Sequence, residues 1–114
     1  MARINYLELP VSDVTASKAF YASVFDFGFT DFGPDYSATT TGDTDLGFNG
    51  DQNEWTAHLL PVIEVGDLEA VEAKVRAAGG TITVPIFPFP GGRRFHFRDV
   101  AGHELAAMQT AVSD

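Results

Sequence analysis

Apolar and polar residues alternate along residues 4–11, near the start of the chain. Leu7 and Leu9 fall on one side of an extended segment, and Tyr6 and Glu8 fall on the other. A period of two is typical of a β-strand that buries one side. Glu8 stands out on this strand because a carboxylate is costly to bury unless it is paired or solvated.

A helix is predicted directly after this strand, over residues 14–25. Asp13 precedes it and can accept hydrogen bonds from the free N–H groups of the first helical turn. Small and apolar residues recur at helical spacing, and we expect this stripe to pack on the sheet with Tyr21 beside it. The stripe comprises Ala16, Ala19, Phe20, Ser23 and Val24.

The second half of the chain repeats this plan. A strand is predicted over residues 55–65, and Asp67 precedes a predicted helix over residues 68–78. Gly79 and Gly80 end that helix, since glycine tolerates the left-handed conformation at a helix terminus. The chain therefore predicts one domain, residues 1–114, built from two repeats at about residues 1–50 and 55–110.

Short strands follow the helix in each repeat, bounded by turns that contain glycine. Residues 85–92 are rich in proline, so we expect a loop there and exclude an interior strand. Residues 110–114 are expected to fray. The expected strands cover residues 27–30, 36–41 and 45–48 in the first repeat and residues 81–84, 93–98 and 104–109 in the second.

Neither repeat can cover its own sheet, so the two are expected to combine. The predicted fold class is α+β, with two βαβββ modules forming a curved mixed sheet that has a concave ligand face and helices outside. Such a concavity is a common place for a ligand site. The modules can pair within one chain or be exchanged between two chains, and the polar residues 51–54 that join them allow either.

Composition narrows the choice of partners. The net charge of −9 argues against a nucleic acid, whose phosphates attract Lys and Arg. Cysteine is absent, which excludes disulfides and thiolate metal sites and favours an intracellular location. No long apolar run indicates a signal peptide or a membrane span, so we predict a cytoplasmic protein with no membrane partner. Residues 26–54 contain seven acids and no Lys or Arg, which suits either a solvated surface or a face that attracts a cation.

Several short motifs together resemble the vicinal oxygen chelate superfamily, which includes glyoxalase I, bleomycin-resistance proteins, extradiol dioxygenases and methylmalonyl-CoA epimerase. The resemblance spans nearly the whole chain and implies the paired modules described above, usually in a homodimer. The motifs are Val11-Ser12-Asp13, Phe20-Tyr21, Val65-Gly66-Asp67, Gly79-Gly80, Pro90-Gly91-Gly92-Arg93 and Phe97-Arg98-Asp99-Val100-Ala101-Gly102-His103.

The resemblance also implies positions for metal ligands, and this chain departs from them. The family's His or Glu ligands map onto Tyr6, onto Leu60 or His58, and onto Ala106. Leucine and alanine donate nothing to a metal, and a protonated tyrosine is a poor donor. We therefore expect the usual metal site to be absent and predict no cofactor. A displaced metal site that uses Glu8, His58 and His96 stays open.

Strand alternation assigns a set of side chains to the concave face. Glu8, His58 and His96 are the candidate catalytic residues, because carboxylates and imidazoles can act as acid and base. Arg94 can grip a carboxylate or a phosphate, or it can lie in a solvated loop or a dimer contact. The candidate ligand-binding residues are Tyr6, Glu8, Trp55, His58, Leu60, Arg94, His96, Glu104 and Met108.

These observations support three kinds of function. The leading hypothesis is a protein similar to the glyoxalase and bleomycin-resistance proteins that binds a small organic molecule without the usual metal. The alternative is a lyase or isomerase of the glyoxalase type that acts on a small carbonyl compound. The third is a regulatory module that has kept the fold and lost the chemistry. Whether the protein is an enzyme stays open.

Overall fold

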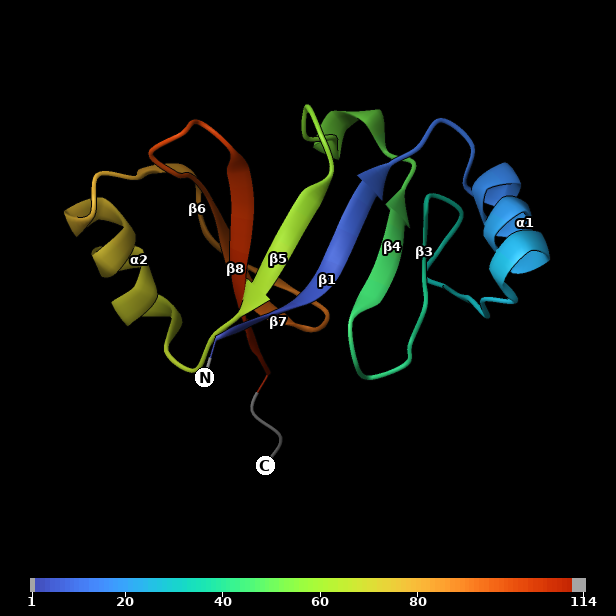
Figure 1. Ribbon diagram of the computed structural model, residues 1–114, viewed down its shortest axis with the longest axis horizontal. Helices are drawn as coiled ribbons and strands as arrows, with labels where there is room; N and C mark the ends of the chain where they lie inside the picture. The colour runs from blue at the N-terminus through green and yellow to red at the C-terminus, as the bar shows by residue number, and fades with distance from the viewer. Residues whose placement is uncertain (1, 112–114) are drawn as a thin grey trace. The chain divides into compact units, whose positions relative to one another are not determined.

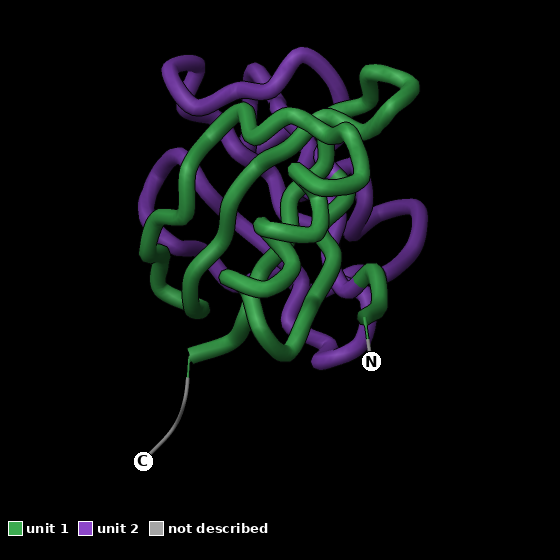
Figure 2. The backbone as a smooth tube through the Cα atoms, turned by 90° about the vertical axis from the view of Figure 1, so that its left-hand side faces the viewer, with its two compact units in different colours: residues 1–4, 61–114 green, residues 5–60 purple. Residues whose placement is uncertain are grey.

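The computed structural model describes residues 2–111, which form two compact units (Figures 1 and 2). Of the described residues, the N-terminal unit contains residues 5–60, and the C-terminal unit contains residues 61–111 together with residues 2–4. Along the described part of the chain, no helix has the length and apolar character needed to cross a membrane.

The N-terminal unit follows the order strand, helix, three strands. Its strands are hydrogen-bonded in the order β2-β3-β4-β1, and β1 runs parallel to β4 while the other pairs are antiparallel. A short 3-10 helix, Gln52–Glu54, ends the unit's ordered elements. The main elements are β1 (Arg3–Pro10), α1 (Val14–Phe25), β2 (Thr30–Asp31), β3 (Tyr36–Ala38) and β4 (Asp45–Asn49).

The C-terminal unit repeats this order. Its strands lie in the order β5-β8-β7-β6, with β5 parallel to β8 and the other pairs antiparallel. Both halves are therefore βαβββ modules with a mixed sheet, which confirms the predicted α+β class. The elements are β5 (Leu60–Glu64), α2 (Leu68–Ala77), β6 (Thr81–Phe89), β7 (Gly92–Arg98) and β8 (Glu104–Thr110).

Both helices begin at the aspartates that the sequence singled out. Asp13 Oδ1 accepts a hydrogen bond from the backbone N–H of Ala16 at 2.9 Å, and Asp67 Oδ1 accepts one from Ala70 at 3.1 Å. A carboxylate in this position satisfies an N–H group that has no partner inside the helix. The repeat predicted from the sequence thus reappears as two equivalent helix starts.

Helix α2, which was predicted over residues 68–78, packs on its sheet through apolar residues. Leu68, Phe95 and Ala107 are almost fully buried and form the centre of the C-terminal core. Val71 and Val75 pack against this cluster from the same side of the helix. Apolar burial of this kind is the main stabilising contribution available to the unit.

Helix α1 presents a different face from the predicted one. The expected stripe is exposed, with 58% of Phe20 and 55% of Val24 accessible, and α1 has no fully buried residue. Val14, Ser17, Lys18 and Tyr21 are instead the partly buried positions. The Tyr21 ring lies 5.4 Å from that of buried Phe48. Because α1 is apolar on nearly all sides, helical spacing alone did not identify the face that packs.

Two strand boundaries differ from the prediction. Strand β6 extends through the proline-rich segment to Phe89, where a loop was expected. It is the last strand of its unit's sheet and carries register shifts near Val84, so its prolines interrupt no interior ladder. Strand β5 begins at Leu60, and residues 55–59 are irregular where a strand was expected.

The ends of the other strands need smaller corrections. Strand β2 covers only Thr30–Asp31 instead of residues 27–30. Thr110, expected to fray, pairs with Gly92 at the end of β8. Ala111, also part of the predicted frayed tail, donates its backbone N–H to the Gly91 oxygen at 3.0 Å, and residues 112–114 lie outside the described residues.

Candidate functional site

A buried carboxylate and two tyrosines are joined by hydrogen bonds on one face of the N-terminal sheet. Tyr36 Oη donates to Glu8 Oε1 at 2.9 Å, and the hydroxyls of Tyr6 and Tyr36 are 2.5 Å apart. Only 6% of Glu8 is exposed. We call these three residues the Glu8 cluster.

Strand alternation explains why the cluster forms on this face. Glu8 lies opposite Gly47 in the register of β1 and β4, and Ala38 of β3 lies opposite Gly47 on its other side. Phe48 follows Gly47 and points to the α1 side, where it meets Tyr21. The cluster therefore occupies the face of the sheet turned away from α1.

Gly47 makes room for the two tyrosines. Their rings come from the strands on either side, β1 and β3, and their hydroxyls meet above Gly47. A Cβ atom at this position would overlap the Tyr6 hydroxyl and would lie 2.6 Å from Tyr36 Oη. A glycine inside a strand often marks such a close approach. Tyr36 and Gly47 are additions to the site that the sequence did not single out.

The surroundings of Tyr36 keep its hydroxyl protonated. Burial, followed by the negative charge of Glu8, raises the pKa of this phenol far above its ordinary value of about 10. Tyr36 therefore retains the proton that it donates to Glu8. This hydrogen bond compensates part of the cost of burying the carboxylate.

A second polar cluster lies on the C-terminal sheet. His96 Nδ1 is 3.4 Å from Glu104 Oε2, and Thr83 Oγ1 donates to the same oxygen at 3.0 Å. His96 is 6% exposed and lies opposite Ala106, on the face turned away from α2. We call these residues the His96 cluster. An imidazole beside a carboxylate can hold or pass a proton.

Arg94 lies on the same side of β7 as His96, two residues away. Its guanidinium carbon is 5.3 Å from the centre of the Phe87 ring and 5.5 Å from that of Phe89. The Phe87 ring is also 5.9 Å from that of His96. Stacking of this kind holds a guanidinium in place.

The remaining candidates have varied environments. His58 is exposed and precedes β5, so strand alternation does not orient it as predicted. The indole N–H of Trp55 donates to the backbone oxygen of Asn49 at 2.7 Å, which indicates a structural contact. Leu60 is fully buried, and Met108 is 7% exposed and lies opposite Arg94. Their roles in binding stay predictions.

The donor set does not fit the metal that the family resemblance implies. The Tyr6 hydroxyl is engaged with Tyr36, while Leu60 and Ala106 have no donor atoms. Within residues 2–111, no three His, Asp or Glu side chains are grouped in a way that could hold a metal ion. The displaced site considered for Glu8, His58 and His96 therefore has no support in the described residues.

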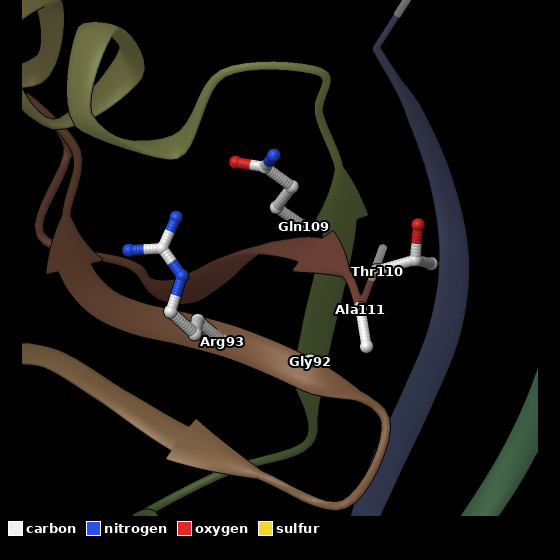
Figure 3. Close-up of a pocket in the computed structure, with 5 residues that line it drawn as sticks. All are labelled: Gly92, Arg93, Gln109, Thr110 and Ala111. Carbon is white, nitrogen blue, oxygen red and sulfur yellow. The ribbon is translucent and has the colours of Figure 1, made fainter. Parts of the chain in front are cut away.

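A hollow of about 260 Å³ lies where β7 begins and β8 ends (Figure 3). Its two long polar side chains already have partners: Arg93 binds both oxygens of Glu69 at 2.5 and 3.1 Å, and Gln109 accepts from the Leu68 N–H at 2.9 Å. These bonds fix the start of α2 on the sheet. The hollow therefore reflects packing around α2, and the two clusters, one in each unit, are two separate candidate sites.

Comparison with known proteins places the chain in context. The sequence profile of the Glyoxalase/Bleomycin resistance protein/Dioxygenase superfamily matches residues 3–107. A search of curated proteins finds no match.

Solved structures share the fold at low sequence identity. A superfamily member from Vibrio splendidus 12B01 has a TM-score of 0.71 and 18% identity, with 97% of this chain and 100% of that chain covered. Methylmalonyl-CoA epimerase from Mycobacterium tuberculosis has a TM-score of 0.74 and 13% identity, with 96% of this chain and 88% of that chain covered. A hypothetical protein from Bacillus halodurans C-125 has a TM-score of 0.79 and 11% identity, with 99% of this chain and 97% of that chain covered.

Proposed function

Because this chain belongs to the glyoxalase/bleomycin resistance protein/dioxygenase superfamily, we propose that it binds a small organic molecule, and that it does so without the metal of the related enzymes. The family hosts many chemistries, so the proposal depends on this chain's own residues. The observation that carries it is the Glu8 cluster. Tyr36 is hydrogen-bonded to the buried Glu8 carboxylate and to Tyr6, and the two tyrosine hydroxyls meet above Gly47. An ordered polar group of this kind can orient a ligand.

A ligand screen on the full chain tests this proposal. We expect small polar compounds to shift amide NMR signals around Gly47, and Glu8→Gln to weaken their binding by about tenfold, since bonds to charged groups contribute most. Asp35→Asn is the matched control, because it makes the same charge change at an exposed position of the same unit. Compounds that bind Glu8→Gln as tightly as the natural chain would contradict the proposed site.

The His96 cluster favours a second candidate, a lyase or isomerase that acts on a small carbonyl compound. An imidazole paired with Glu104 can remove and return a proton beside a carbonyl group. One structural neighbour is a methylmalonyl-CoA epimerase, although the likeness extends to the fold alone. Incubation with hydroxyacetone in D₂O tests the idea. Deuterium uptake that is lost in His96→Gln would support turnover, and uptake no faster than in buffer would count against it.

We also propose that the protein is a homodimer in the cytoplasm. Support for the dimer comes from α1, where large apolar side chains remain exposed: 58% of Phe20, 55% of Val24 and 56% of Phe25. An apolar helix face that is left open commonly marks a surface for another protein. The absence of cysteine supports the intracellular location.

A further inference from the structure

We infer that the exposed surface of α1 binds a basic amphipathic helix of another protein, one that carries Lys or Arg beside its apolar side chains. The proposed dimer uses the same helix, and the inference goes beyond it by naming a different preferred partner. Its basis is the apolar patch on α1, the acidic residues that accompany the patch, and the C-terminal end of the helix.

The apolar patch is continuous through ring contacts. The centre of the Tyr21 ring lies 5.2 Å from that of Phe20 and 6.0 Å from that of Phe25. Phe27, which is 41% exposed, extends the group at 5.6 Å from Phe25. Val24 lies one helical turn after Phe20 and is exposed as well. We call Phe20, Val24, Phe25 and Phe27 the α1 patch.

The residues that accompany the α1 patch are acidic. Residues 12–36, which contain α1 and its flanks, hold four aspartates and a single lysine, with no Glu, Arg or His. Lys18 Nζ lies 2.7 Å from Asp31 Oδ1, so this lysine is already paired. An apolar patch with negative flanks complements a partner whose apolar side chains have positive neighbours.

The C-terminal end of α1 also matches a cation. The free carbonyl groups of a last helical turn favour positive charge and disfavour negative charge. Helix α2 has Lys74 and Arg76 in its last turn, whereas α1 has no basic residue there and ends at Asp26. Within residues 2–111, Asp26 is also the one residue besides glycine with a positive φ, 61°. A basic side chain of a partner would supply the missing charge beside Phe25.

Charge separates this partner from a second copy of the chain. Two α1 patches in a symmetric dimer would each bring the same aspartates to the contact. Like charges across an interface weaken association. A helix with an apolar stripe and basic flanks fits the patch without that repulsion, so it should displace the second copy.

Three fluorescein-labelled peptides test the inference on the full chain. The first has leucine and lysine at helical spacing, the second has glutamate in place of lysine, and the third has the composition of the first in scrambled order. Fluorescence anisotropy should show the leucine–lysine peptide binding about tenfold more tightly than either control. Its affinity should fall as the salt concentration rises.

A variant within the α1 patch locates the contact. Phe20→Ser should weaken binding of the leucine–lysine peptide about tenfold, since large aromatic residues contribute most to such interfaces. Val100→Ser is the control, because it makes a similar loss of apolar surface at a position that is 85% exposed and lies outside α1. It should leave the affinity unchanged.

Asp26→Asn separates recognition from stability. Asparagine tolerates a left-handed backbone, and a helix C-terminus is better off without the carboxylate. The variant should therefore bind the leucine–lysine peptide several-fold more weakly while resisting urea at least as well as the natural chain. Glu72→Gln, which removes one carboxylate from α2, should bind normally.

The outcomes distinguish this inference from the proposed dimer. Light scattering that shows a dimer converted to single chains by the leucine–lysine peptide supports both. A dimer that persists at saturating peptide assigns the surface to a second copy and overturns the inference. Peptide binding to a chain that is always monomeric supports the inference and excludes the dimer. Equal affinity for the three peptides, or for Phe20→Ser and the natural chain, would show that the α1 patch recognises no basic helix.

Lipid is the remaining occupant that the test identifies. Vesicles of phosphatidylcholine that bind the natural chain but not Phe20→Ser would assign the α1 patch to a membrane surface and overturn the inference.

Discussion

Gly47 is the residue on which the Glu8 cluster depends most directly. In Gly47→Ala the added Cβ atom would overlap the Tyr6 hydroxyl and crowd that of Tyr36. Both obstacles are the tips of side chains that can rotate away, so we expect the free energy of unfolding to fall by only about 1 kcal/mol. Binding of the small polar compounds in the ligand screen should weaken to the level seen for Glu8→Gln. Chemical denaturation and NMR titration measure the two effects, and an alanine variant with full affinity would show that the tyrosines do not need this space.

Tyr36 makes the free energy of unfolding depend on pH in the alkaline range. Burial and the charge of Glu8 raise the pKa of this phenol in the folded state above its unfolded value of about 10. Its contribution to stability is therefore complete below pH 10 and is lost as pH rises further, because the unfolded chain releases the proton first. The free energy of unfolding should fall steeply above about pH 10.

The variant Tyr36→Phe isolates this effect. It should be less stable near neutral pH and should show a shallower fall in the unfolding free energy above pH 10, measured by urea denaturation at a series of pH values. Equal slopes for the natural chain and the variant would mean that another group controls alkaline unfolding.

At the scale of single elements, the two helix starts offer a direct comparison. Asp13 and Asp67 make the same bond to the third residue of their helices, at 2.9 and 3.1 Å. Replacing either aspartate by alanine should lower the free energy of unfolding by about 1 kcal/mol. Asparagine at either position should keep most of the stability, since its side-chain oxygen can accept the same bond. Denaturation midpoints of the four variants would measure this, and an alanine variant as stable as the natural chain would refute the capping role.

The elements also show what could be predicted from the sequence. Helix α2 was predicted correctly because Asp67 and the apolar spacing of Leu68, Val71 and Val75 agree with each other. The packing face of α1 was predicted wrongly, because Phe20 and Tyr21 are neighbours in sequence and both are large enough to pack on the sheet. The proline-rich segment has the composition of a loop, and sequence alone does not show that β6 lies at a sheet edge, where prolines are tolerated.

The site was predictable only in part, for a related reason. Alternation correctly placed Tyr6 and Glu8 on one face of a strand. Their bond partner Tyr36 is far away in sequence and becomes a neighbour only because β4 lies between β1 and β3. Local patterns do not encode that strand order. The His96–Glu104 contact, in contrast, joins two adjacent antiparallel strands and lies among residues already assigned to one face.

At the scale of the whole molecule, the proposed dimer can be measured directly. Light scattering after size exclusion should give twice the 12.3 kDa of one chain. Phe20→Asp places a charge on the exposed face of α1 and should shift the mass toward that of one chain. Val100→Asp is the control, because Val100 is also apolar and is 85% exposed but lies in the turn between β7 and β8. A natural chain that elutes only at 12.3 kDa would exclude the dimer.

Strand β3 is only three residues long, yet it supplies the tyrosine that holds Glu8. Ligand binding to the cluster and pairing of this short strand with its sheet are therefore thermodynamically linked. A ligand that binds only when β3 is paired lowers the population of molecules in which β3 is detached. Amide hydrogen exchange in Tyr36–Ala38 would then report on the ligand without any chemistry taking place. The N-terminal unit would act as a sensor, with the protection of one small strand rising as the cluster fills.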